Sequence, residues 1–175
     1  MMTDTFDKAL AIILKHEGGY VNHPRDPGGR TNLGVTQNTL ESYLGRKVTE
    51  AEMRALKPAD VAPIYRKRYW DAMRCDDYPA GLALCVFDFG VNAGIRRGVR
   101  YLQIIAGATQ DGIAGPGTTR AARDFLTEHG EAEAVRRYSN ARRGYYKQLP
   151  TVGTFGKGWM RRVDETEADA LRMAS

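Results

Sequence analysis

The sequence predicts a mainly α-helical fold with a small β-containing insert near the N-terminus. Apolar residues recur near every 3.6 positions along most of the chain, and capping signals precede several of these segments. The stretch 20–36 breaks the pattern, since it holds two prolines and three glycines, and its short apolar alternation suits a hairpin. The 175 residues suffice for one ordinary domain or for two small lobes that share a core.

The first expected helix begins at a cap formed by Thr3, Asp4 or Thr5. Its apolar residues lie between positions 6 and 14, and Gly18 with Gly19 ends it. Glu17 is therefore expected on the last helical turn, at the edge of the irregular stretch.

The later helices are predicted from caps, prolines and apolar periodicity. The run 82–91 is apolar on nearly all sides and is interrupted by Asp88, which predicts a buried central helix. The expected segments are 39–44, a helix opened by a capping box at 49–52, one from Pro58 through Trp70, 82–91, 96–105, 118–128 with Thr118 or Thr119 as cap, 131–148 and 158–173.

The net charge of +5 is concentrated in one part of the chain. Residues 1–92 are neutral overall, residues 93–162 carry a net +8, and residues 163–175 carry −3. Such a basic surface suits an anionic partner, which could be nucleic acid, a membrane surface or an acidic cell-wall polymer. The arginines at 136, 137, 142 and 143 form either a nucleic-acid stripe or a solvated helix face.

Several classes of protein are not expected from this sequence. The longest apolar runs, 9–14 and 82–87, are six residues each, whereas a membrane span needs about 20. The first residues lack a secretory signal pattern, so we expect a cytoplasmic protein without membrane insertion. Only Cys75 and Cys85 occur, without metal-ligand spacing, so we expect reduced, partly buried thiols, no metal site and no cofactor.

The stretch 16–36 carries the residues best suited to chemistry. Cleavage of an acetal needs an acid that protonates the leaving oxygen and a carboxylate that supports the attacking group. Glu17 at the end of a buried helix could be shielded, while Asp26 in a polar loop would stay charged. A hydroxyl of Thr31 or Thr36 could hold the attacking water. Alternatively, Glu17 only caps or salt-bridges a helix end, and Asp26 only begins a turn.

The run H-E-G-G-Y…D-P-G-G-x-T-N-x-G-V-T at 16–36 resembles the signature of the glycoside hydrolase family 108 muramidases, which are phage and prophage endolysins. K-R-Y-W-D at 67–71 and F-D-F-G-V-N-A-G at 87–94 extend the resemblance over nearly the whole chain. The resemblance implies a two-lobed, lysozyme-like α-helical fold. It also implies hydrolysis of the β-1,4 bond between N-acetylmuramic acid and N-acetylglucosamine, with Glu17 as the catalytic acid.

A second resemblance concerns the other catalytic groups. Phage lysozymes of another family use a Glu, an Asp after eight intervening residues and a Thr after five more. Eight residues separate Glu17 from Asp26 here, but only four separate Asp26 from Thr31. Asp26 and Thr31 are therefore the expected partners of Glu17, with Thr36 competing for the role of Thr31. The reaction could be a single displacement, towards which this spacing leans, or could retain configuration.

Further residues are expected to bind substrate. Asn32 and Thr36 belong to the same signature run. Tyr69 and Trp70 form either part of the core or a flat aromatic wall for a sugar ring. Asp88 and Asn92 are four apart and share a helix face, where they form a core hydrogen-bond pair or hold N-acetyl groups.

The C-terminal half carries the run Q-D-G-I-A-G-P-G-T at 110–118, which resembles a turn of peptidoglycan-binding helical modules. We read it mainly as a loop-shaping turn, with glycan contact as the alternative. The expected organisation is a catalytic lobe at 1–92 and a peptidoglycan-binding-type lobe at 93–175, packed as one unit. The basic charge of the second lobe would then attract the enzyme to an acidic wall.

These observations predict a monomeric endolysin that acts on bacterial peptidoglycan and binds no nucleic acid. It would stay in the cytoplasm until a holin releases it to the wall. One alternative is a lytic transglycosylase, which needs one essential Glu and no water-activating partner. The other is a non-catalytic protein that binds peptidoglycan or nucleic acid, which the G-G-x-T-N-x-G loop at 28–34 disfavours.

Overall fold

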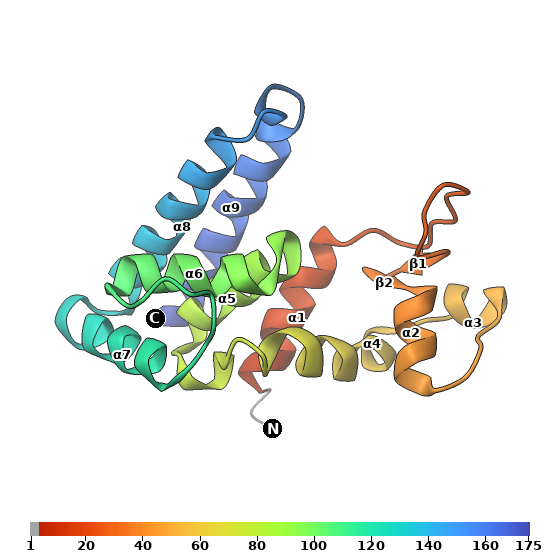
Figure 1. Cartoon of the computed structure of the whole chain (residues 1–175), viewed down its shortest axis with the longest axis horizontal. Coiled ribbons are helices and arrows are strands. Elements are labelled where there is room, and N and C mark those ends of the chain that lie inside the picture. The colour runs from red at the N-terminus through yellow and green to blue at the C-terminus, as the bar shows by residue number, and fades with distance from the viewer. Residues whose placement is uncertain (1–3) are drawn as a thin grey trace. The chain divides into compact units, whose positions relative to one another are not determined.

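A computed structural model describes residues 4–175, so Thr3, one of the expected caps, lies outside the described part. Within it, nine α-helices and one antiparallel pair of two-residue strands are found (Figure 1). This confirms the mainly α-helical, lysozyme-like class with a small β insert. The backbone forms two compact units that divide between Arg68 and Tyr69. No helix in residues 4–175 is both long and apolar enough to cross a bilayer.

The first unit contains four helices and the β-hairpin. Helix α1 buries an apolar face that includes Phe6 and Ile13 and packs against α4. The capping box is confirmed, because the Thr49 hydroxyl accepts the Glu52 N–H and the Glu52 carboxylate accepts the Thr49 N–H. The elements are α1 (Thr5–His16), β1 (Thr31–Asn32), β2 (Val35–Thr36), α2 (Gln37–Leu44), α3 (Glu50–Arg54) and α4 (Pro58–Tyr65).

The α-helical part of the helix that starts at Pro58 ends earlier than expected. Pro58 occupies its first turn as predicted, but α4 ends at Tyr65, and Arg66–Trp70 forms a π-helical turn, η1. Pro63 lies inside α4, where it lacks the N–H that a regular helix would use. The segment from Pro58 through Trp70 is thus helical as predicted, but its last five residues are π-helical instead of α-helical.

The second unit is an assembly of five α-helices with α5 at its centre. Every residue of α5 from Gly81 to Gly90 is buried, which confirms the predicted central helix, and α5 packs on α6, α8 and α9. A Cβ on Gly98 of α6 would lie 3.0 Å from the Gly90 Cα, so small residues let these helices approach. The elements are η2 (Cys75–Asp77), α5 (Ala80–Ala93), α6 (Ile95–Ala106), α7 (Pro116–His129), α8 (Glu131–Lys147) and α9 (Val152–Ala174).

Helices α7 and α9 both begin earlier than the sequence predicts. Helix α7 begins at Pro116 after an N-cap at Gly115, so Thr118 and Thr119 lie inside it rather than at its cap. Helix α9 begins at Val152, although three glycines in its first turns disfavour a helix. Packing outweighs this cost, since Trp159 of α9 stacks on Tyr146 of α8 with ring centroids 5.1 Å apart.

The lobe boundary expected between residues 92 and 93 stays a prediction. The compact units divide earlier, because α5 makes its contacts with α6, α8 and α9. The boundary expected from the sequence and the boundary found from packing therefore fall at different residues.

Neither cysteine forms a disulfide and both are buried, Cys75 at the start of η2 and Cys85 in the middle of α5. Burial raises the pKa of the Cys85 thiol to about 12. They act as small apolar side chains that are more deeply buried than the sequence predicts.

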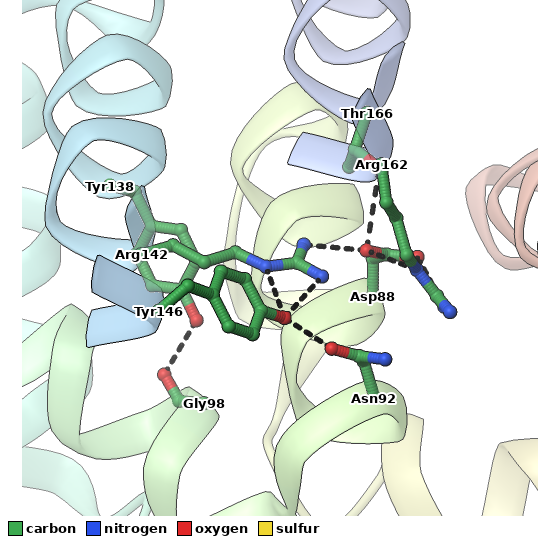
Figure 2. A network of polar contacts seen from close by, with 8 residues as sticks. All are labelled: Asp88, Asn92, Gly98, Tyr138, Arg142, Tyr146, Arg162 and Thr166. Carbon is green, nitrogen blue, oxygen red and sulfur yellow. Dashed lines mark hydrogen bonds and ion pairs between the residues drawn. The ribbon is translucent and has the colours of Figure 1, made fainter. Parts of the chain in front are cut away.

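A buried carboxylate joins three helices of the second unit (Figure 2). Asp88 of α5 is fully buried and accepts from Arg142 of α8 at 2.5 Å and from Arg162 of α9 at 2.9 Å. The Thr166 hydroxyl donates to the same carboxylate at 3.3 Å. Burial alone would raise the pKa of Asp88, but the two guanidinium groups outweigh burial and hold that pKa below its usual value.

We expect Asp88→Asn to destabilise the protein by about 3–5 kcal/mol, because it leaves buried Arg142 and half-buried Arg162 without their counter-charge. Urea unfolding followed by circular dichroism at pH 7 measures the loss. Asp124→Asn is the matched control, since Asp124 is an exposed carboxylate on α7, and should change stability by less than about 0.5 kcal/mol.

The same pair of variants predicts a pH dependence. A carboxyl group with a lowered folded pKa stabilises the fold above its unfolded pKa of about 3.9, and this contribution is lost as pH falls through the folded pKa. The difference between wild type and Asp88→Asn should therefore shrink only below about pH 4. An equal difference at pH 7 and well below pH 3 would contradict a charged Asp88.

Candidate active site

Glu17 stands where α1 ends. Its N–H still donates to the Ile13 carbonyl oxygen at 3.2 Å, but its backbone is extended, so the chain leaves the helix at this residue. The side chain belongs to a half-buried residue. The sequence prediction of a carboxyl group at the end of a buried helix is thus matched by the local geometry.

The tip of the β-hairpin lies against this carboxyl group. Strands β1 and β2 pair Thr31 with Thr36, and the two-residue turn between them, Leu33 and Gly34, has φ values of +51° and +74°. Positive φ at both positions defines a tight hairpin turn. A β-carbon on Gly34 would lie 3.0 Å from Glu17 Oε2 and 2.2 Å from the Tyr65 hydroxyl oxygen.

Tyr65 completes this contact and was not singled out from the sequence. It is buried at the end of α4, and its hydroxyl donates to the Leu33 carbonyl oxygen at 2.9 Å. Its hydroxyl and the Glu17 carboxylate both border Gly34. The signal for this arrangement was Gly34 itself, because a residue with positive φ at a crowded point must be glycine.

Asp26 lies in an exposed loop that its own side chain shapes. Its Oδ1 accepts the Gly28 N–H at 2.8 Å, and its carbonyl oxygen accepts the Gly29 N–H at 3.1 Å. This is the Asx turn that the sequence allows as the alternative role. Asp26 is exposed, so the turn leaves this residue accessible to water.

The two candidate threonines have different surroundings. Thr36 caps α2, where its hydroxyl accepts the Thr39 N–H at 3.2 Å and donates to the Thr39 hydroxyl at 2.9 Å. A β-carbon on Gly28 would lie 3.1 Å from the Thr36 Cβ and 3.2 Å from Asp26 Oδ1, so both side chains border that glycine. The Thr31 hydroxyl is enclosed and makes no hydrogen bond within residues 4–175.

Asn32 holds the hairpin in place. Its side chain is buried, and Nδ2 donates to the Met53 carbonyl oxygen at 2.8 Å, at the end of α3. This amide nitrogen already makes a hydrogen bond within the fold. The expected contact of Asn32 with substrate stays a prediction.

The other four predicted site residues belong to the second unit. Trp70 is fully buried, its indole N–H donates to Asp76 at 2.8 Å, and its ring meets Phe87 edge to face. Asp88 forms the buried ion pairs described above. Their surroundings match the core alternative, and their sugar contacts stay predictions.

Tyr69 and Asn92 are more accessible than Trp70 and Asp88. Asn92 is exposed, and its side-chain oxygen accepts from the Tyr146 hydroxyl, which in turn accepts from Arg142 (Figure 2). Tyr69 is half-buried in η1. The structure thus joins Asp88 and Asn92 in one network, as their spacing suggested.

The arginines that could have formed a nucleic-acid stripe are mostly engaged elsewhere. Arg142 is buried against Asp88, Arg137 pairs with Glu133 at 2.8 Å, and Arg143 pairs with acids of α9. These contacts engage three of the four arginines, and Arg136 is exposed on the same helix. Among residues 4–175, no cluster of three or more potential metal ligands occurs.

Comparisons with known proteins agree with this geometry. Residues 10–94 match the family model described as glycosyl hydrolase 108, and residues 97–164 match one described as a predicted peptidoglycan domain. The solved structure of SagA from Brucella abortus is 40% identical, with a TM-score of 0.79, and the match covers 97% of this chain and 95% of that one. No curated protein matches the chain.

A half-buried carboxyl group beside a hairpin and a solvated carboxylate in a glycine-rich loop are groups that a glycoside hydrolase requires. The chain belongs to the glycosyl hydrolase 108 family and is a glycoside hydrolase that acts on peptidoglycan.

We expect Gly34→Ala to reduce peptidoglycan hydrolysis by about 100-fold, because the added methyl group must displace the Tyr65 hydroxyl and the Glu17 carboxyl group. The rate of turbidity loss of a peptidoglycan suspension at 25 °C measures this effect.

The matched control is Gly45→Ala. Gly45 has a similar φ of +70°, but nothing lies within 4 Å of its added β-carbon. It should share the backbone strain of about 1 kcal/mol and keep the activity. Equal activity of the two variants would show that the hairpin tip does not position Glu17.

Proposed function

We propose that the protein hydrolyses the β-1,4 bond between N-acetylmuramic acid and N-acetylglucosamine, with Glu17 as general acid. The observation that carries this proposal is the position of the Glu17 carboxyl group, half-buried at the end of α1 and held beside Gly34 and Tyr65. A carboxyl group at this position can act as the acid that protonates the leaving glycosidic oxygen.

Asp26 is proposed as the second carboxylate. It is exposed and its oxygen Oδ1 is held by the Gly28 N–H, which leaves the other oxygen able to accept from a water molecule. In an inverting reaction, this carboxylate would take a proton from the water that attacks the anomeric carbon. The sequence spacing favours inversion over retention.

A threonine hydroxyl is proposed to help orient that water. Thr36 borders the same glycine as Asp26, but its hydroxyl already caps α2. The Thr31 hydroxyl has no hydrogen bond within residues 4–175, so it has bonding capacity to offer if the hairpin shifts on binding. Thr31 therefore remains the proposed partner, in agreement with the sequence prediction.

Glu17→Gln keeps the size of the side chain and removes its proton. We expect the rate of peptidoglycan hydrolysis to fall by about 10²–10⁴-fold, the usual contribution of a general acid. Glu128→Gln, which changes an exposed carboxylate on α7, should leave the rate unchanged. Wild-type turbidity clearance by Glu17→Gln would exclude the assignment.

Asp26→Asn separates a hydrolase from a lytic transglycosylase. The asparagine side-chain oxygen can still accept the Gly28 N–H, so the turn is preserved while the charge is lost. A hydrolase should lose about 100-fold or more in rate and release reducing ends. Full activity together with anhydro-muramoyl ends, detected by mass spectrometry, would instead establish a transglycosylase.

We further propose that the enzyme serves as an endolysin of phage or prophage type. The support is the resemblance of the run 16–36 to endolysin sequences. Production of the protein alone should then leave a bacterial culture intact, whereas co-production with a holin should lyse it. Lysis at the same rate without the holin would contradict this route.

A further inference from the structure

The second unit has a groove of about 450 Å³ that the catalytic proposal does not use. Three arginines of α6, Arg96, Arg97 and Arg100, line one wall. The opposite side is formed by the loop that contains Asp111 and by Tyr145 near the end of α8. The groove therefore gathers cationic and aromatic side chains at one place.

None of the three arginines has an ion-pair partner within residues 4–175. Arg96 donates to the Asp111 carbonyl oxygen at 3.1 Å, Arg97 donates to a carbonyl oxygen at the end of α5, and no hydrogen bond of the Arg100 side chain is found. The Asp111 carboxylate, whose Oδ1 accepts from Gln103 and from the Ile113 N–H, offsets only part of their charge, since one carboxylate faces three guanidinium groups. The groove thus keeps an excess of positive charge.

The three arginines do not stabilise α6. They occupy its first two turns, where the helix dipole is positive, and no acidic residue lies in the first turn. Cations at that position disfavour a helix rather than support it. A local arrangement that opposes the fold points to a role in binding.

Hydrogen bonds from Gln103 hold the loop that lines the groove. The Gln103 side chain is buried and bonds to Asp111, Ile113 and Thr118, while its oxygen accepts the Gly112 N–H at 2.9 Å. This network gives the 110–118 run the structural role that the sequence analysis favoured.

The aromatic side chains of the groove are held by contacts with one another and with Arg97. Tyr101 and Tyr145 meet edge to face with centroids 5.9 Å apart, and the Arg97 guanidinium lies 4.5 Å from the Tyr145 ring centroid. Ile104, 40% exposed, adds apolar surface one turn further along α6. A ligand for this groove would combine anionic groups with a short apolar chain.

We propose that this groove binds the carboxylates of the peptide stems of peptidoglycan. The inference rests on the proposed function for its choice of polymer. Guanidinium groups bind carboxylates through paired hydrogen bonds, and the three arginines are spaced to engage more than one. Ile104 and Tyr101 would contact the methyl and methylene groups of the stem.

The test is a titration of the full-length protein with the soluble stem tripeptide L-alanyl-γ-D-glutamyl-meso-diaminopimelate, followed by NMR at low salt. The variant Arg96→Gln/Arg97→Gln/Arg100→Gln should bind at least about tenfold more weakly than wild type. The matched control Arg120→Gln/Arg123→Gln/Arg136→Gln removes the same charge from exposed positions of α7 and α8 and should bind normally.

A second measurement uses the polymer in the Glu17→Gln background, to limit digestion. Intact sacculi should retain the protein better than sacculi stripped of stems by an amidase, and the groove variant should lose this difference. Equal losses in the groove and control variants, absence of tripeptide binding, or binding of a DNA oligonucleotide in place of the tripeptide would each overturn the proposal. The tripeptide contains no glycosidic bond, so this result is independent of whether Glu17 is the acid.

Discussion

The charge of Asp88 is the constraint on which the second unit depends. A carboxylate in the middle of an apolar helix is tolerated only if other groups neutralise it and donate hydrogen bonds to it. Arg142 and Arg162 do so from two different helices, which favours the observed register of α8 and α9 on α5. Apolar contacts alone would allow these helices to slide, and the ion pairs select one arrangement among the close-packed ones.

The first unit relies on a different kind of constraint, the crowding around Gly34. The turn at Leu33 and Gly34 needs positive φ, and the space beside Gly34 is filled by Glu17 and Tyr65. The Tyr65 hydroxyl ties the turn to α4 through Leu33. A carboxyl group next to such a rigid point has few rotamers open to it, which favours the preorganisation that acid catalysis needs.

Local signals predicted much of this fold, whereas partners distant in sequence could not be predicted. The capping box at Thr49 and the apolar run of α5 are written in neighbouring residues, and both are confirmed. The pairing of Asp88 with Arg142 spans 54 positions, and no local sequence pattern predicts it. The start of α9 was missed because helix propensity disfavours its glycines, and only packing against α8 makes it helical. For the catalytic groups, the run 16–36 indicated Glu17 and Asp26 without revealing how the hairpin surrounds them.

The burial of the two cysteines has a consequence for the reactivity of their thiols. Neither Cys75 nor Cys85 forms a disulfide, and burial suppresses the thiolate form of Cys85 on which oxidation and disulfide exchange depend. The fold therefore needs no disulfide and presents no reactive thiol. Oxidation or disulfide exchange at Cys85 would therefore require the fold to open first.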